Sequence, residues 1–455
     1  MSNYTIYREH RGVFGTGARA RSVTVKGLEW SSGKVERRRF SDCPSAYDIA
    51  AWMRASFEGP CYAAYEAGGS GFSLCRDLRG IGIDCDVIAT SSIARSAKDK
   101  KGKTDSRDAS RLLAEPLKPD DEGRAPVWVP PYEVEAARDI ARAREDARQI
   151  VADAKQRLRA LLLRHGCVWN EKTASGNRVK SWGTRLDRWL DGIALEGEGA
   201  REALASCRES IRLDEELVAH LDSQIATLCA EPRWKPYVDA LVLVKGIDTR
   251  TAFLTAAEFG RFSRFRSGRS ATSWIGCAPS ESSSGEHRAH GRITKCGNSH
   301  LRRALTEGAS AVRRFNRNMK QPAAGHEVSE EPRVMARKAT HRVHKRYTSL
   351  VARGIHANKA KMAAVSEMAR WLWAIGCVVE RDEAAKQGNR PEVASAPTRG
   401  EPAIETCAPR SRGMRDRRMT KRTILRRKAP NEPLKCGPRA VSTDLRVSRY
   451  DALRR

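Results

Sequence analysis

The stretch CYAAYEAGGSGFSLCRDLRGIGIDCDVIA, residues 61–89, decides the fold class of the first third of the chain. It opens with a short apolar run that ends at Glu66, and a glycine-rich turn follows. Residues 72–79 have the pattern of a helix, and residues 83–89 have that of a second strand. A strand, a helix and a strand in this succession predict an α/β domain.

The residues upstream of this stretch predict a strand hairpin and one helix. Residues 22–30 alternate apolar and polar side chains as a strand does. A Ser31-Ser32-Gly33 turn follows, and residues 34–40 match a returning strand. Residues 46–56 are typical of a helix. We therefore expect an α/β fold with a central mixed sheet.

A short helix with two carboxylates is predicted after this sheet. Residues 103–109, KTDSRDA, open a helix that continues through Leu113. Asp105 and Asp108 are three residues apart, so they share one face of the helix. The simpler alternative is that Thr104 or Asp105 caps the helix and Asp108 complements its dipole.

Two long amphipathic helices are predicted next. Residues 133–165 contain no Pro or Gly, and their apolar residues recur at three- and four-residue steps. Residues 200–230 form the second helix, and a polar connector separates the two. This pattern predicts an antiparallel coiled-coil arm, which also offers a surface for dimerisation. The apolar stripe of the second helix is expected in the core or seam: Leu213, Leu217, Leu221, Ile225 and Leu228.

The last ordered part of the chain is predicted to be helical. Residues 238–260 predict two helices joined by a tight turn that contains Lys245 and Gly246. Exposed amides of such a turn can bind a DNA phosphate, although any helical hairpin needs a glycine there. Further helices are expected over residues 270–276, 299–314, 333–353 and 359–376.

Between these helices lies a concentration of serine and cationic side chains, APSESSSGEHRAHGRITKCGNSHLRR, residues 278–303. A serine hydroxyl can attack phosphorus, and cations can hold the non-bridging oxygens of a phosphodiester. The alternative is a flexible Ser/Gly loop before a basic helix that only holds DNA. Together with the turn, the residues expected to bind nucleic acid are Lys245, Gly246, His287, Arg288, Arg292, Lys295, Asn298, Arg302 and Arg303.

The composition points to a polyanionic partner. The chain has 455 residues, a formal net charge of +29 and a pI of about 10.0, which favours nucleic acid over a membrane surface. Its twelve cysteines include no CxxC pair, which argues against a zinc site or a disulfide framework. We expect no signal peptide and no membrane-spanning run, hence a cytoplasmic, nucleoid-associated protein. Residues 388–455 are rich in Pro, Lys and Arg and predict a disordered basic tail.

Taken together, these motifs resemble the DEDD transposases of the IS110 group of bacterial insertion sequences, over roughly residues 12–378. The resemblance implies a ribonuclease-H-like domain, similar to the resolvase RuvC, at residues 12–125. It implies a coiled-coil arm at residues 126–232 and an α-helical transposase domain with a catalytic serine at residues 233–378. It also implies a structured non-coding RNA, the bridge RNA, that pairs with donor and target DNA. The matching segments are AYEAGGSGFSLCRDLRGIGIDCDVIA, KTDSRDA, KGIDTRTAFLTAAEFGRF, WIGCAPSESSSGEHRAHGRITKCGNSHLRRAL and HKRYTSLVARG.

The resemblance also implies roles for particular residues. Glu66 corresponds to the second acid of the DEDD set, and Asp105 and Asp108 to the third and fourth. Their hard oxygen ligands suit Mg²⁺. Ser284 corresponds to the nucleophile, and Ser283 is the alternative because the serine run blurs the register. The implied activity is that of an insertion-sequence transposase, which cuts and rejoins DNA as a dimer or tetramer.

One position departs from the family's pattern. The family's first acid lies at the start of the first strand in a pattern like GIDxHxRS, whereas residues 15–22 here are GTGARARS. Gly17 therefore stands where the aspartate is expected, and glycine cannot ligate a metal. Either three carboxylates bind Mg²⁺ or this copy has lost activity. A metal-dependent resolvase-like nuclease and a nucleic-acid-binding protein without catalysis remain the alternative functions.

Overall fold

The computed structural model describes residues 9–90, 93, 105–117, 126–179, 182–284, 287–312, 328–386 and 388. For residues 105–108, 281–284 and 287–290 it describes the backbone alone. The predicted tail at residues 388–455 lies outside the described residues, apart from Gly388.

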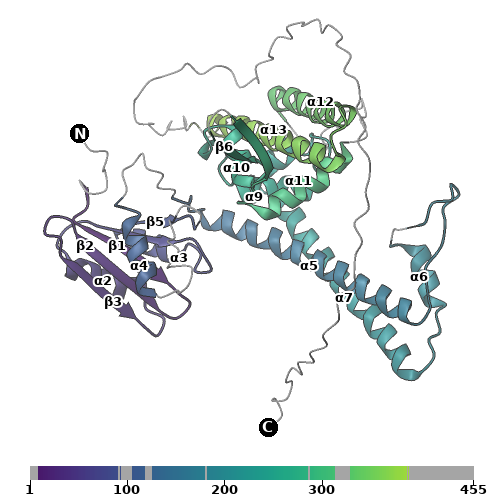
Figure 1. Ribbon diagram of the computed structural model, residues 1–455, viewed down its shortest axis with the longest axis horizontal. Helices are drawn as coiled ribbons and strands as arrows, with labels where there is room; N and C mark the ends of the chain where they lie inside the picture. The colour runs from purple at the N-terminus through teal and green to yellow at the C-terminus, as the bar shows by residue number, and fades with distance from the viewer. Residues whose placement is uncertain are drawn as a thin grey trace, which may run out of the picture. The chain divides into compact units, whose positions relative to one another are not determined.

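A five-stranded mixed sheet forms the centre of the N-terminal region, as the sequence predicts (Figure 1). Its strands are β1 (Gly12–Ala18), β2 (Val23–Glu29), β3 (Val35–Phe40), β4 (Cys61–Glu66) and β5 (Asp84–Ile88). Their order across the sheet is β3-β2-β1-β4-β5. The pairs β1–β2 and β2–β3 are antiparallel, whereas β1–β4 and β4–β5 are parallel. The C-terminal ends of β1, β4 and β5 therefore meet at one edge of the sheet.

Helices cover both faces of this sheet. They are α2 (Ala46–Ser56), α3 (Ser73–Gly80) and α4 (Asp105–Ala114). Phe14 and Tyr65 pack in the same hydrophobic cluster as residues of α2 and α3. Val13, Tyr62 and Ala64 pack in a second cluster with residues of α4. Since successive strand side chains point to opposite faces, these clusters assign each strand residue either to the α2/α3 face or to the α4 face.

Two helices of 33 residues each form the predicted arm. Helices α5 (Tyr132–Arg164) and α7 (Glu198–Ala230) run side by side, and α6 (Thr184–Asp191) lies in their connection (Figure 1). Arg144 pairs with Asp222, and further along α5 Lys155 pairs with Glu215. The residue number of the partner on α7 falls as the residue number on α5 rises, so the two helices are antiparallel, as predicted.

The seam of this arm differs from the predicted stripe. On α7 the buried apolar residues include Leu204, Ile211 and Ile225. Leu213 and Leu217 were expected in the seam but are 52 % and 47 % exposed. That expectation is therefore wrong for these two leucines, which lie on the side of α7 away from the buried Leu204 and Ile211.

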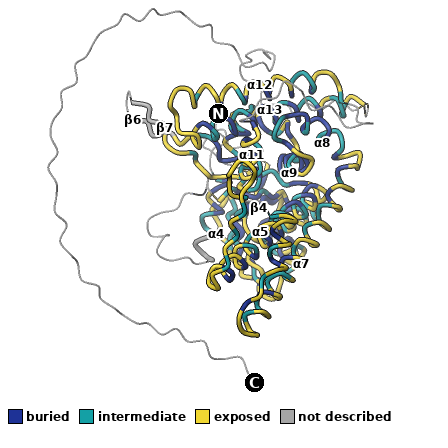
Figure 2. The backbone as a smooth tube through the Cα atoms, turned by 90° about the vertical axis from the view of Figure 1, so that its right-hand side faces the viewer, coloured by how far each residue is buried: buried dark blue, intermediate teal, exposed yellow. Residues whose placement is uncertain are grey.

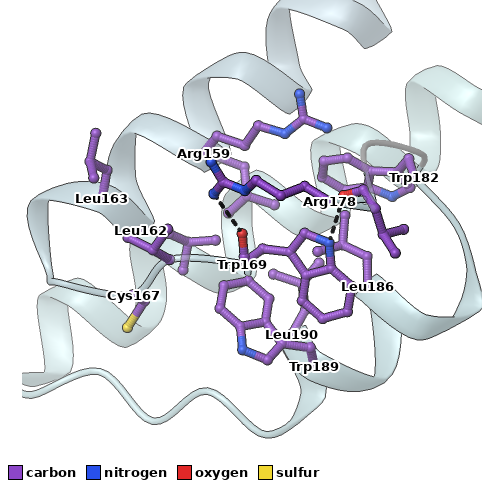
Figure 3. A pocket seen from close by; sticks show the side chains of 13 residues that line it. Arg159, Leu162, Leu163, Cys167, Trp169, Arg178, Trp182, Leu186, Trp189 and Leu190 are labelled. Carbon is purple, nitrogen blue, oxygen red and sulfur yellow. Dashed lines mark hydrogen bonds between the residues drawn. The ribbon is translucent and has the colours of Figure 1, made fainter. Parts of the chain in front are cut away.

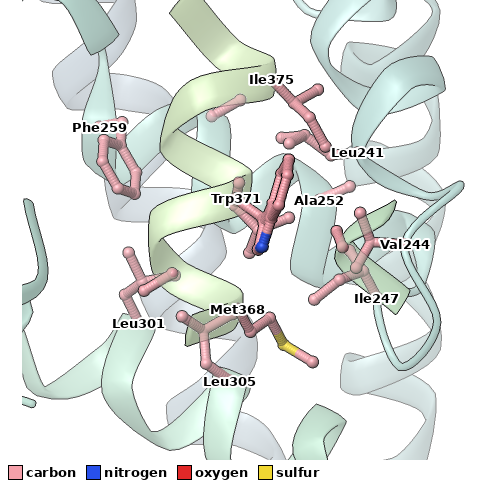
Figure 4. Close-up of a cluster of buried hydrophobic side chains, with 14 of the residues drawn as sticks. Leu241, Val244, Ile247, Ala252, Phe259, Leu301, Leu305, Met368, Trp371 and Ile375 are labelled. Carbon is pink, nitrogen blue, oxygen red and sulfur yellow. The ribbon is translucent and has the colours of Figure 1, made fainter. Parts of the chain in front are cut away.

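The C-terminal region is a helical bundle with one small hairpin. Its helices are α8 (Lys235–Leu241), α9 (Thr249–Phe259), the 3₁₀ helix η1 (Phe262–Arg264), α10 (Gly268–Ile275), α11 (Ser299–Ala311), α12 (Glu330–Ala352) and α13 (Ala357–Lys386). Strands β6 (Pro279–Ser284) and β7 (His287–Ile293) pair between α10 and α11. Met368, Trp371 and Ile375 of α13 lie in one cluster with buried residues of α8, α9 and α11 (Figure 4). Figure 2 shows the buried residues gathered along α9 and α13.

Helix α13 bears on the expectation that the chain has no membrane-spanning run. It is long and apolar enough to cross a membrane by length and composition alone, with a mean hydropathy of 1.3 over its most apolar window. Half of that window is buried within the protein. Val365, Met368 and Leu372 are fully buried in the bundle. The apolar composition of α13 is thus accounted for by its central position in this core.

Candidate functional site

Glu66 and Gly17 are neighbours at the C-terminal edge of the sheet. The last printed pair of the parallel β1–β4 register is Thr16 with Tyr65, so the next positions are Gly17 and Glu66. Tyr62 and Ala64 face α4, and Glu66 follows them at the next even position, half-buried. Gly17 therefore lies next to Glu66 on the α4 face. The structure also corrects the expectation that this position begins its strand, because Gly17 lies near the end of β1.

Helix α4 packs directly on β1 at Gly15. A Cβ atom on Gly15 would lie 2.2 Å from the Leu113 amide nitrogen and 2.3 Å from the Ala109 carbonyl oxygen. Asp108 immediately precedes Ala109, and Asp105 lies one turn earlier on α4. The backbone of this helix turn is thus held against the strand that contains Gly17. The side chains of Asp105 and Asp108 lie outside the described residues, and no metal-binding group of three ligands is found among those described.

Two residues of β2 extend the α4 face, and the sequence motifs did not single them out. Lys26 pairs with Gly15, and its Nζ donates to the Ser110 hydroxyl of α4 at 3.1 Å. Thr24 pairs with Gly17 and is 2 % exposed. The strand alternation of residues 22–30 was the available signal, since every second residue of β2 must face α4.

The serines form part of a two-stranded sheet. Ser284 pairs with His287, and Ser283 pairs with Arg288. This pairing replaces the alternative of a flexible Ser/Gly loop with an extended hairpin. The side chains of Ser283, Ser284, His287 and Arg288 lie outside the described residues. The structure thus places Glu66 beside Gly17 and packs α4 on the same strand at Gly15, while both serines belong to a separate element of the helical bundle.

A tight turn joins this hairpin to α11. The amide of Lys295 donates to the Gly276 carbonyl oxygen at 3.1 Å, and the amide of Asn298 donates to the Trp274 carbonyl oxygen at 3.0 Å. Lys295 has a φ of 55°, in the left-handed region that favours glycine. Its side chain is exposed, as is that of Arg292. These two predicted nucleic-acid-binding cations are therefore on the surface.

Asn298, in contrast, is bonded inside the protein. Its Oδ1 accepts from the Leu301 amide at 2.9 Å and caps α11, and its Nδ2 donates to Glu258 at 2.6 Å. Glu258 is 1 % exposed and also accepts two hydrogen bonds from Arg142 of α5, at 2.8 and 3.0 Å. Burial alone lowers the pKa of Arg142, but the bonds to Glu258 outweigh it and raise that pKa. Arg138 adds a second cation 3.7 Å from Glu258.

Arg302 and Arg303 are engaged in protein contacts as well. Arg302 donates through Nη1 to the Ile275 carbonyl oxygen at 2.8 Å, which fixes α11 against the end of α10. Arg303 pairs with Glu145 of α5, and His300 contacts the same carboxylate. Together with Asn298, these residues connect α11 to α5 and α10. The sequence showed their charge but not their partners, because those partners are far away along the chain.

The turn between α8 and α9 is also packed internally. The amide of Lys245 donates to the Thr340 hydroxyl of α12 at 3.2 Å. Gly246 has a φ of 92°, and a Cβ atom there would lie 2.3 Å from the Gly308 carbonyl oxygen of α11. The Lys245 amide is thus used within the bundle. Gly246 is required by the close approach of two backbones as well as by its φ.

Comparison with known proteins adds independent information. A family model described as "Transposase IS116/IS110/IS902 family" matches residues 238–324, which include the hairpin and α11. A Sinorhizobium fredii protein with the name "Putative transposase y4qE" is 35 % identical over 324 residues, covering 71 % of this chain and 77 % of its own. A Leptospira borgpetersenii protein, named as the transposase for insertion sequence element IS1533, is 28 % identical over 301 residues, covering 64 % and 82 %.

Proposed function

The chain belongs to the IS116/IS110/IS902 family of transposases, and on that premise we propose that it recombines DNA with a serine nucleophile and carboxylates at the sheet edge. The coarser statement, an insertion-sequence transposase that acts on DNA, follows from the family. The observation that carries the finer proposal is the position of Glu66. It ends β4 on the face that α4 covers, beside Gly17. The sheet order β3-β2-β1-β4-β5 supports a ribonuclease-H-like domain here.

Three carboxylates are proposed to hold Mg²⁺ at this edge: Glu66, Asp105 and Asp108. Oxygen donors from a strand end and from the first turns of the adjacent helix fit the hard-ligand preference of this ion. Packing of α4 on Gly15 keeps the two aspartate positions beside the strand that contains Gly17. When bound, Mg²⁺ supplies positive charge that offsets the charge of a scissile phosphate. Lys26 adds a fixed cation on the same face.

The proposed reaction has two transfers at phosphorus. The Ser284 oxygen forms a bond to phosphorus, the bond from phosphorus to a deoxyribose oxygen breaks, and the serine proton is balanced by the proton that the departing oxygen gains. In the second transfer, a hydroxyl of the partner strand attacks the phosphoserine, and the serine oxygen regains its proton. The number of phosphodiester bonds is conserved, so no ATP is consumed. Ser283 remains the alternative nucleophile.

The partners follow from the same proposal. DNA ends and a DNA target are the substrates, a structured non-coding RNA selects them, and the protein acts as a dimer or tetramer in the cytoplasm at the nucleoid. Exposed Arg292 and Lys295 support contact with a phosphate backbone beside the hairpin. The acids and the serines stand on different elements, which is consistent with a site completed by more than one subunit.

The nucleophile is tested by trapping a covalent protein–DNA adduct with a DNA that carries the element's ends, supplied with the adjacent non-coding RNA. Ser284→Ala is expected to abolish an adduct that survives denaturation, whereas Ser282→Ala, a change of the same kind on the same strand, keeps it. RNA binding and the thermal transition of Ser284→Ala should match those of the unaltered protein. An adduct that persists in Ser283→Ala/Ser284→Ala contradicts the serine assignment, and cleavage with free phosphate ends favours the nuclease.

A second candidate, nucleic-acid binding without catalysis, is favoured by one observation, the glycine at position 17. Adding an aspartate beside Glu66 restores a fourth carboxylate to the α4 face. If the site is otherwise intact, Gly17→Asp raises adduct formation, and Glu66→Gln in that background removes it again. If neither the original protein nor Gly17→Asp cuts DNA with any divalent metal, the non-catalytic function is the better description.

A further inference from the structure

A cavity of about 410 Å³ lies at the α6 end of the arm (Figure 3). We call it the tip cavity, and its volume is in the range typical of small-molecule sites, roughly 300–1,000 Å³. The last turns of α5, the connector and α6 enclose it. Its lining consists of Leu158, Arg159, Leu162, Leu163, Cys167, Val168, Trp169, Arg178, Val179, Trp182, Leu186, Trp189 and Leu190.

Three indole rings form much of its wall. Trp169 and Trp189 contact each other with ring centroids 5.4 Å apart. The Trp169 ring is fixed further, because its Nε1 donates to the Val179 carbonyl oxygen at 3.2 Å. Trp182 contributes a third ring from the start of the segment that leads into α6 (Figure 3). Rigid aromatic walls of this kind can receive a flat ring by stacking.

Cations accompany these rings. Lys155 and Arg159 lie over Trp182, with their charged groups 4.7 and 5.5 Å from the ring centroid. Arg178 reaches the Trp169 carbonyl oxygen from the opposite wall (Figure 3). No carboxylate occurs among the described residues that line the cavity. Segment 155–190 has nine Lys and Arg against two Asp and Glu, whereas residues 191–216, which lead into and begin α7, have three against eight, so the positive charge is confined to the cavity side of the arm end.

From this combination we propose that the tip cavity binds one unpaired base of single-stranded DNA, with Arg159 and Arg178 contacting the flanking phosphates. Aromatic side chains in a positively charged groove are the means by which proteins hold single strands. DNA is the polyanion that the family acts on, so the proposal commits to DNA. The arm would then hold a displaced strand away from the catalytic elements. The inference does not depend on the catalytic proposal, since a chain without activity would keep this cavity.

The charge decides between this occupant and a protein. Leu163 and Val168 at the rim are 65 % and 51 % exposed, which alone would also suit an apolar segment of another protein. The lining also contains Arg159 and Arg178 and, among the described residues, no carboxylate. A phosphate backbone is attracted by the same charge, and its bases supply the flat rings that the indoles accept.

The test uses the full-length protein and a short single-stranded oligodeoxynucleotide with 2-aminopurine at one position. Stacking of this base on an indole quenches its fluorescence. Trp182→Ala is expected to remove most of the quenching and to weaken binding about 5-fold or more, the lower end of base-stacking effects. Trp30→Ala, the loss of an exposed indole on the sheet domain, is the matched control and should leave both unchanged. Arg178→Gln should lower the slope of DNA affinity against salt concentration by about one, the effect of losing one phosphate contact. Arg212→Gln on α7 should leave this slope unchanged.

Further measurements distinguish single-stranded DNA from the other possible occupants of the tip cavity. Quenching that is as strong with duplex DNA, or that survives in Trp182→Ala with an unchanged thermal transition, overturns the proposal. Tighter binding and stronger quenching with the matching oligoribonucleotide overturns the assignment to DNA. Leu163→Glu is the last variant. If this substitution changes the molecular mass of the protein in sedimentation but leaves the 2-aminopurine quenching unchanged, the cavity is an interface between proteins. Loss of DNA cleavage plays no part in these readouts, so they fail or succeed independently of the catalytic proposal.

Discussion

The sheet edge at Glu66 and the turn after the serine hairpin both contain residues expected to meet nucleic acid, and they use those residues differently. At the sheet edge, α4 rests on β1 because Gly15 has no side chain, and Glu66 stands at the end of the neighbouring strand. After the hairpin, charge is abundant, but Asn298 and Arg302 are bonded to other parts of the protein.

The difference shows what each kind of residue reveals. A glycine in a strand indicates that another backbone comes close, and at Gly15 this is the helix that contains two predicted acids. A cation indicates only that some partner exists. In the turn after the hairpin that partner is a buried carboxylate or a carbonyl oxygen for some residues and solvent for others.

The largest effect is expected at Gly15. In Gly15→Ala the added Cβ would meet backbone atoms of α4 at 2.2–2.3 Å, which no side-chain rotation can relieve. We expect a loss of at least about 3 kcal/mol in the stability of the sheet domain, at the upper end of overpacking costs. Hydrogen exchange across residues 105–114 and the first thermal transition measure it.

The control for this prediction is Gly69→Ala. A Cβ at Gly69 meets nothing within 4 Å, so exchange in α4 should stay as it is. If Gly15→Ala leaves the exchange of α4 unchanged, the direct packing of this helix on β1 is wrong, and with it the argument that Asp105 and Asp108 are held beside Gly17.

The next effect is expected at Glu258, which ties the arm to the bundle. Glu258→Gln keeps the shape but removes the carboxylate that Arg142 and Arg138 contact in a largely buried position. We expect a destabilisation of about 2 kcal/mol, less than the cost of a fully buried orphan charge because Arg142 is 39 % exposed. Denaturant unfolding followed by tryptophan fluorescence measures it.

Glu209→Gln is the matched change on the surface of the arm, where the pair with Arg212 is exposed. No measurable change is expected there, since exposed pairs are worth little. Equal effects of the two substitutions would mean that Glu258 is not the carboxylate that connects α5 to α11.

Much of the fold was predictable because its signals are local. Strands β2 to β5, helix α2 and both arm helices follow from alternation or from three- and four-residue spacing. Strand β1 was not predicted from its pattern, because three glycines in GVFGTGA weaken any strand signal. Its extended form comes from pairing with β2 on one side and β4 on the other. Strands β6 and β7 were not predicted for a related reason, because serine and charged residues have little preference for strands.

The candidate site was predictable in part. Glu66 was expected at the end of its strand, and it is there. The bonding of Asn298 to Glu258, 40 residues away, could not be read from the pattern of charges. The packing of the Lys245 turn could not be read from the sequence either. A helical hairpin led us to expect exposed amides there. Its contact with Gly308 and Thr340 depends on how α11 and α12 pack, which no local pattern contains.

The smallest effects are expected when the exposed cations are replaced. These substitutions compare cations on the surface directly with a cation that is bonded inside the protein. Arg292→Gln and Lys295→Gln each remove one surface charge and should weaken DNA binding a few-fold, lowering the salt slope by about one each. Arg302→Gln changes the same charge but breaks the bond to the Ile275 carbonyl oxygen, so it should cost about 1 kcal/mol of stability. Its salt slope should stay near that of the unaltered protein, because a cation held by a carbonyl releases no counterion from DNA. Titrations at several salt concentrations, with thermal unfolding of each variant, separate the two classes. If Arg302→Gln lowers the salt slope as much as Arg292→Gln does, the division between internal and DNA-facing cations fails.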